Sequence, residues 1–102
     1  MWPFRRKSQA DKAIAHMSEV VRISSERWKY FLSTMPFKNQ VGLAEQISIF
    51  SFPMISGIRK AFPELEKSPD EVIYLFILKG IESSGTHTGD ELETALGFQI
   101  PE

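Results

Sequence analysis

The sequence contains no cysteine, and this absence excludes several kinds of chemistry at once. Disulfide bonds, thiolate nucleophiles and zinc sites built on sulfur all require that residue. A chain without cysteine is compatible with a reducing compartment, so we expect a cytoplasmic location.

Long apolar runs are missing as well. The most weakly charged stretch, residues 39–58, has Glu45 as its only charged side chain and, as a helix, would just cross the roughly 30 Å hydrocarbon core of a bilayer. Its Asn, Gln and Ser side chains and Pro53 disfavour a membrane span, and a buried central helix explains it better. The basic N-terminus is not followed by an apolar run of signal-peptide length, so we predict no export signal.

What is present suits one small water-soluble domain. The chain has 102 residues, of which 42% are hydrophobic and 25% charged. We predict one helical domain over residues 8–98, with a basic and aromatic tail at 1–7 and a short tail at 99–102. Residues 1–38 are net basic and those from 61 onward net acidic, so the two parts would attract each other within one fold or between two copies.

Hydrophobic spacing and capping residues predict an all-α fold, a small bundle of about four helices. The predicted helices span residues 8–34, 39–62, 69–84 and 89–96. Ser8 would cap the first helix, and the second would be kinked or split at Pro53, because proline cannot donate to the Ile49 carbonyl. Small residues of the second helix would let another helix approach closely; they are Gly42, Ser48, Ser51 and Gly57.

The third helix is predicted from its first turn. Ser68 would supply the capping hydroxyl, Pro69 the first helical position and Glu71 the reciprocal contact. Residues 72–78 are apolar on all sides, which is typical of a helix enclosed by its neighbours, and Gly85 would end it. Without these caps the same run would fit a buried strand, so the alternative is an α+β fold with short strands at 46–52 and 72–78.

The last predicted helix begins after Thr88, a second hydroxyl cap with a glutamate, Glu91, three residues later. Gly97 would end this helix in the left-handed conformation. We expect Phe98 to pack back onto the core.

Few side chains are suited to catalysis, and only two of them are histidines. His16 falls on the polar side of the first helix and is expected in solvent. A weak polar-turn candidate consists of His87, Thr88 and Asp90, which could bind an anion at a helix N-terminus, although capping explains the same residues. The turn lacks the spacing of a phosphate-binding loop or a third metal ligand. We therefore predict no catalytic site, cofactor or metal.

Residues 89–98 look like the opening helix and turn of a helix-turn-helix DNA-binding domain, which is a further alternative. A recognition helix would come next, but the sequence ends at Glu102. Asp90, Glu91 and Glu93 would repel phosphate, so nucleic acid is not the expected partner.

By elimination, we expect a non-enzymatic helical module that binds another protein or forms a homodimer. The chain has more apolar side chains than four short helices readily bury, and a pair of apolar helix faces is a common dimerisation surface. The candidate anchors are Trp28, Phe31, Phe50 and Phe52. The alternative is attachment to a membrane surface or an acidic partner through the N-terminus. The residues that would make that contact are Trp2, Phe4, Arg5, Arg6 and Lys7.

Overall fold

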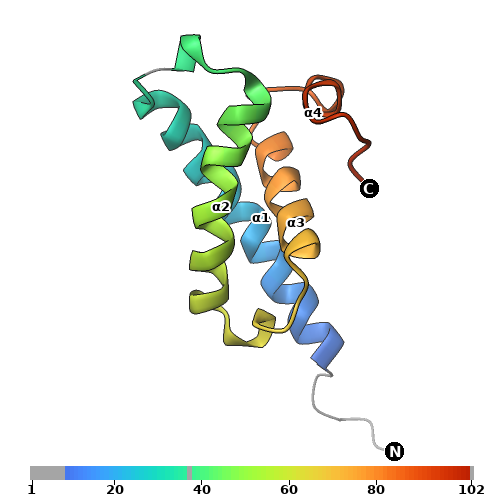
Figure 1. Cartoon of the computed structure of the whole chain (residues 1–102). Helices are drawn as coiled ribbons and strands as arrows, with labels where there is room; N and C mark the ends of the chain where they lie inside the picture. The colour runs from blue at the N-terminus through green and yellow to red at the C-terminus, as the bar shows by residue number, and fades with distance from the viewer. Residues whose placement is uncertain (1–8, 37, 102) are drawn as a thin grey trace, which may run out of the picture.

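The computed structural model describes residues 9–36 and 38–101, with side chains from residue 15 onward except at residue 38. Its elements in chain order are α1 (Gln9–Thr34), the 3-10 helix η1 (Lys38–Gln40), α2 (Leu43–Ala61), the 3-10 helix η2 (Pro63–Leu65), α3 (Asp70–Ser83) and α4 (Gly89–Leu96) (Figure 1). Across this part of the chain there is no strand. The all-α prediction is confirmed, and the alternative strands at 46–52 and 72–78 are wrong.

The three long helices form an antiparallel bundle in which each helix runs opposite to the one before it (Figure 1). α1 has its most extensive contacts with α3, and α2 lies against both with fewer. α4 sits at the end of the bundle where α2 begins and α3 ends, and it contacts α2. The bundle therefore has a close α1–α3 pair with α2 laid along it.

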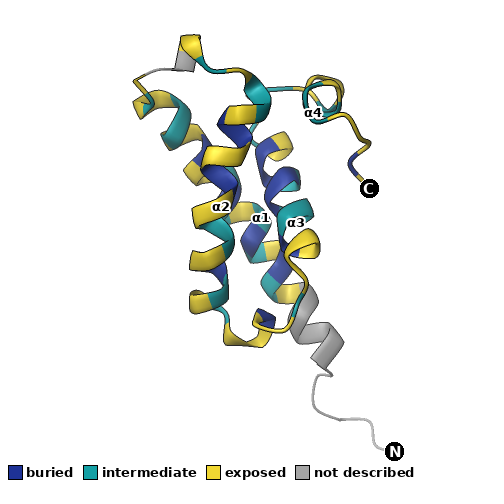
Figure 2. Ribbon diagram, viewed as in Figure 1, coloured by how far each residue is buried: buried dark blue, intermediate teal, exposed yellow. Residues whose placement is uncertain are grey.

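One hydrophobic core runs through the bundle and includes side chains from all four helices (Figure 2). Its buried apolar members are Met17, Val20, Trp28, Ile47, Phe50, Ile58, Leu65, Ile73, Ile77, Leu78, Ile81, Leu92 and Ile100. The apolar stripes predicted for the first two long helices supply many of them. Spacing by three and four residues located the inner sides of these helices correctly.

α3 is less enclosed than its sequence suggests. Ile73, Ile77 and Leu78 are buried, but Val72 is 36% exposed, and Tyr74 is only partly buried. The prediction that residues 72–78 are shielded on all sides is wrong, because α1 and α2 leave part of the helix open to solvent.

α3 approaches α1 very closely at Gly80. A Cβ atom added there would lie 2.5 Å from the Ser24 Cβ and 2.6 Å from the Val21 carbonyl oxygen, both on α1. Only glycine lets the two backbones come this close. We expected such an approach at small residues of α2, but a Cβ at Gly57 would meet open space.

α2 is one continuous helix, so Pro53 does not split it. Proline cannot donate to the Ile49 carbonyl, but both Pro53 and Ile49 are exposed, so water can replace the lost bond. The helix begins at Leu43 rather than 39, because residues 38–40 form η1 and Gly42 is extended at the N-cap.

The predicted helix ends are partly confirmed. The Thr88 hydroxyl accepts from the Glu91 N–H at 3.1 Å while the Glu91 carboxylate accepts from the Thr88 N–H at 2.7 Å, and Gly97 is left-handed with φ 84°. Ser68 does not cap α3: the N-cap is Pro69, whose carbonyl accepts from the Val72 N–H.

The C-terminal residues also differ from expectation. Phe98 is 43% exposed and does not pack into the core, whereas Ile100 is buried. The Ile100 N–H donates to the Glu93 carboxylate at 2.9 Å, which ties the segment after α4 back to that helix.

Candidate interaction surface

The polar turn between α3 and α4 is built around the indole of Trp28. The Trp28 Nε1–H donates to Thr86 Oγ1 at 2.8 Å, and that oxygen lies 3.0 Å from both Ser84 Oγ and His87 Nδ1. The His87 ring lies 6.2 Å from the Trp28 ring between centroids. The turn thus closes one end of the core and satisfies a buried indole N–H.

The polar-turn candidates do not form one joined cluster. Thr88 is engaged by Glu91 in the capping box, and this backbone contact lowers the pKa of the Glu91 carboxyl. Within residues 9–36 and 38–101, no hydrogen bond or ion pair links Asp90 to His87 or Thr88. Over the same residues, no group of three or more His, Asp or Glu side chains is arranged to hold a metal ion.

We expected His16 to lie in open solvent, and this prediction is wrong. Its ring centroid lies 5.1 Å from that of Phe62, and its Nδ1 lies 3.8 Å from a Glu64 carboxylate oxygen. The prediction failed because the turn after α2 folds back over this side of α1.

Two of the four predicted anchors belong to the core. Trp28 and Phe50 are buried, and their rings meet edge to face with centroids 5.2 Å apart. Phe31 packs beside both, with centroids 5.6 Å from Trp28 and 5.5 Å from Phe50, and is partly buried. Only Phe52 is an exposed anchor, with 74% of its surface accessible.

Phe52 is the centre of an uncharged surface on α2, which we call the α2 outer face. All its members are exposed and recur at three- and four-residue steps: Ser48, Ile49, Phe52, Pro53, Ser56 and Gly57. Glu45 and Lys60, both exposed, bound it at its two ends. The low charge of this stretch predicts an interior position, but its outer half faces solvent (Figure 2).

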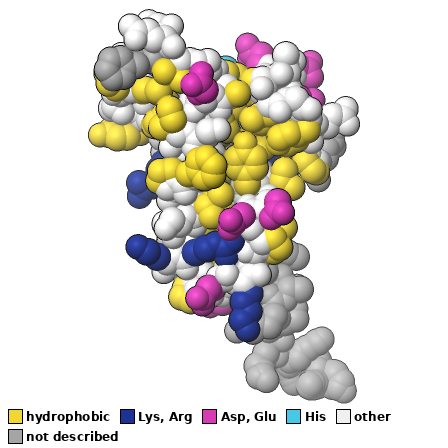
Figure 3. Space-filling model, viewed as in Figure 1, with side chains coloured by type: hydrophobic (Ala, Val, Ile, Leu, Met, Phe, Trp, Pro, Cys, Tyr) yellow, Lys and Arg dark blue, Asp and Glu magenta, His cyan; other side chains and the backbone are white. Residues whose placement is uncertain are grey.

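A groove runs along each side of this face. The α2–α3 groove has a volume of about 530 Å³; Phe52, Ile55 and Tyr74 line its apolar part, and its charged lining residues are Arg59, Asp70 and Glu71. The α1–α2 groove has about 580 Å³, and its lining includes Tyr30, Ile49 and the charged Arg27. In Figure 3 hydrophobic side chains gather over α2 and α3, with Lys, Arg, Asp and Glu side chains grouped below them.

Arg59, the one charged side chain between Glu45 and Lys60, is engaged within the chain. Its guanidinium donates to the Glu66 carbonyl at 2.6 Å, to the Ser68 carbonyl at 2.7 Å and to the Asp70 carboxylate. These bonds join the end of α2 to the start of α3 and hold the charge beside the α2 outer face. The role of Arg59 was not predicted, because two of its partners are backbone carbonyls in a turn and the third, Asp70, lies eleven residues away.

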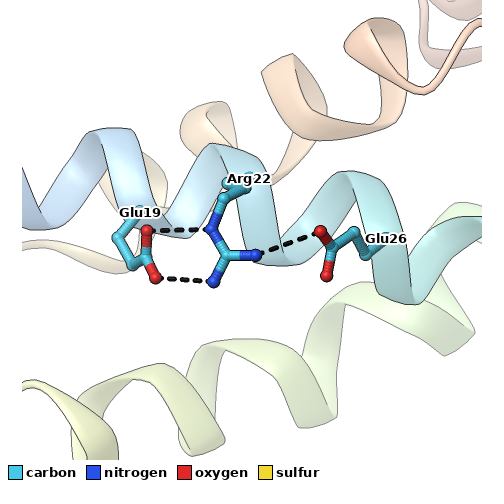
Figure 4. Close-up of polar contacts among 3 residues, drawn as sticks. All are labelled: Glu19, Arg22 and Glu26. Carbon is cyan, nitrogen blue, oxygen red and sulfur yellow. Dashed lines mark hydrogen bonds and ion pairs between the residues drawn. The ribbon is translucent and has the colours of Figure 1, made fainter.

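α1 presents a different kind of surface. Arg22 donates to Glu19 at 2.6 and 3.0 Å and to Glu26 at 3.0 Å, so the three side chains form an exposed ion-pair row (Figure 4). The Arg22 guanidinium lowers the pKa of the Glu19 carboxyl. This side of α1 is a charged, hydrated surface, in contrast to the α2 outer face.

The remaining predictions concern the two ends of the chain. The N-terminal set of Trp2, Phe4, Arg5, Arg6 and Lys7 lies outside the described residues. From Gly97 to Pro101 the chain forms no helix, so α4 is not followed there by a recognition helix.

No helix in the described part of the chain has the length and apolar character needed to cross a bilayer. Comparison of the sequence with protein-family models, of the chain with curated proteins and of the fold with solved structures gave no match in any of the three.

Proposed function

We propose that this chain is a non-enzymatic module that binds protein through the α2 outer face and its two grooves. The observation that carries the proposal is the exposure of Phe52 and Ile49, 74% and 51%, on a surface without a charged side chain. Contiguous apolar surface of this kind is typical of interaction sites. A partner that covers it gains roughly 25 cal/mol for each Å² of apolar area removed from water.

The shape of the surface also suits a protein partner. Phe52 and Ile49 stand between two grooves, while Ser56 and Gly57 leave room for a backbone to approach. A helix laid along α2 would cover the ridge and reach into both grooves, as amphipathic helices do in apolar clefts. The uncharged middle and charged ends resemble the apolar core and polar rim of protein interfaces.

Site-specific photocrosslinking in cells tests this function. The photoreactive residue p-benzoylphenylalanine replaces Phe52 in the full chain, and the matched control carries it at Thr94, an exposed position on α4 that lines neither groove. We expect discrete protein adducts from position 52 and none from position 94.

Competition makes the test specific. Excess unlabelled chain should abolish the adducts at position 52, and excess Ile49→Glu chain should not, since a charge on this face opposes burial. Equal adducts from both positions, or none from position 52, would contradict the proposal.

A further inference from the structure

We infer that the partner of the α2 outer face is a second copy of this chain, bound through the same face with the two α2 helices antiparallel; this inference rests on the proposed function. The observation behind it is that the face is complementary to itself. The two copies would be related by a two-fold axis that passes between Phe52 and Pro53.

Charge complementarity fixes the direction of the two helices. With the axis at that point, Glu45 of one copy lies opposite Lys60 of the other, about 11 Å from the axis along the helix at 1.5 Å per residue. Neither side chain has an ion-pair partner within residues 9–36 and 38–101, and both are exposed. A parallel arrangement would instead place Glu45 against Glu45 and Lys60 against Lys60, which repel.

The sizes of the side chains also fit this register, because larger side chains of one copy face smaller ones of the other. Ile49 lies opposite Ser56 of the second copy, and Ser48 lies opposite Gly57. Each contact therefore sets a side chain against a smaller one, so two helices can approach without a clash. Phe52 meets Pro53 across the axis, which covers the most exposed apolar side chain of the face.

The symmetry gives a closed assembly. A two-fold contact uses the same patch on both copies, so a dimer leaves no copy of the α2 outer face open. The charged side of α1 stays in water, and Arg59 keeps its own carbonyl and carboxylate partners. Glu45 and Lys60, the charges at the two ends of the α2 outer face, would each have an opposite charge across the axis, which avoids the cost of burying an unpaired charge.

Single charge-reversal variants of the full chain test the arrangement. Their association is measured by sedimentation equilibrium from low to high micromolar concentration. Wild type should be a reversible dimer. Glu45→Lys alone and Lys60→Glu alone each create two like-charge pairs across the axis, and each should raise the dissociation constant about tenfold, or about 1.4 kcal/mol.

An equimolar mixture of the two variants is the decisive sample. In the mixed dimer the lysine introduced at position 45 faces the glutamate introduced at position 60, and the native Lys60 faces the native Glu45. The mixture should therefore recover wild-type affinity within about threefold, and recovery also shows that both variants are folded. Lys67→Glu and Glu66→Lys, on exposed positions outside α2, are matched controls that should not change the dimer.

Cysteine crosslinking gives an independent measure of register, and the chain has no cysteine of its own to interfere. Mixed Ile49→Cys and Ser56→Cys chains should form a disulfide-linked heterodimer under mild oxidation. Ile49→Cys mixed with Lys67→Cys should not.

The outcomes separate this inference from the proposed function. A monomer at every concentration, or a dimer indifferent to both charge reversals and their mixture, overturns the antiparallel self-pair. If adducts at position 52 then contain a different protein, the binding function stands and its partner is not a second copy. If position 52 gives no adduct and the chain is monomeric, both proposals fail.

Discussion

The indole N–H of Trp28 donates to the Thr86 hydroxyl across 58 residues of sequence, at 2.8 Å. Trp28 is completely buried on α1, and Thr86 lies in the turn between α3 and α4. A buried indole that loses its acceptor retains the cost of its desolvation. This bond therefore connects the position of the polar turn to the stability of the core.

Thr86→Val should lower the free energy of unfolding by about 1–3 kcal/mol, because valine has the same shape and no acceptor. Urea unfolding followed by far-UV circular dichroism measures the change. Thr94→Val, at an exposed position of α4, is the matched control and should alter stability by less than about 0.5 kcal/mol. Equal stability of Thr86→Val and wild type would show that the bond contributes nothing.

Gly80→Ala should destabilise the bundle, although alanine favours a helix over glycine by about 1 kcal/mol. The added methyl group would meet Ser24 and Val21 of α1, and overpacking of this kind costs about 1–3 kcal/mol. Gly57→Ala is the control on α2, where the methyl group meets open space and only the helix preference remains. Thermal unfolding in dilute solution should rank Gly57→Ala above wild type and Gly80→Ala below it.

Arg59→Ala should destabilise the chain by about 2–3 kcal/mol, because hydrogen bonds from a charged donor are among the stronger ones. Arg59→Lys should recover only part of the loss, since an ammonium cannot reproduce the guanidinium fork that reaches both Glu66 and Ser68. Lys67→Ala serves as the exposed cationic control. Chemical denaturation of the four proteins gives the ranking, and an Arg59→Ala chain as stable as Lys67→Ala would refute this role.

Acid should weaken the start of α4. The folded chain lowers the pKa of Glu91 from its ordinary value of 4.5, mainly through the hydrogen bond from the Thr88 backbone. A carboxyl with a lowered folded pKa contributes stability above its unfolded pKa and loses it as pH falls through the folded value. The difference in unfolding free energy between wild type and Glu91→Gln should therefore be constant above about pH 5.5 and shrink below about pH 4.5. A difference that does not vary with pH would contradict this.

Local chemistry explains which parts of this fold were predictable. Thr88, Glu91 and Gly97 were assigned correctly because every partner in those caps lies within a few residues. Ser68 was assigned wrongly: the N-cap is Pro69, and the Ser68 carbonyl accepts from Arg59, nine residues earlier in the chain. The contact with Arg59 has no signature in the sequence around the cap.

The surface on α2 was harder to predict for a different reason. Spacing by three and four residues assigns Phe50 to the inner side of this helix and leaves Phe52 off it, but the low charge of the whole stretch favoured burial of both sides. Which side is covered depends on where α1 and α3 lie, and that is set partly by the close approach at Gly80. Of the four aromatic residues predicted as surface anchors, Trp28 and Phe50 are buried, Phe31 is partly buried and Phe52 is exposed.

The close contact at Gly80 has a consequence for how the molecule responds to dilution. α1 and α3 meet nearly backbone to backbone, whereas α2 is kept in place by side chains that reach across a wider gap. If a second copy covers α2, mass action adds binding free energy to the one of the three long helices that has the fewest contacts with the rest of the fold. Local opening of α2 would then occur more often in dilute solution and be suppressed as copies accumulate, which would make the amount of protein in a cell a determinant of its rigidity.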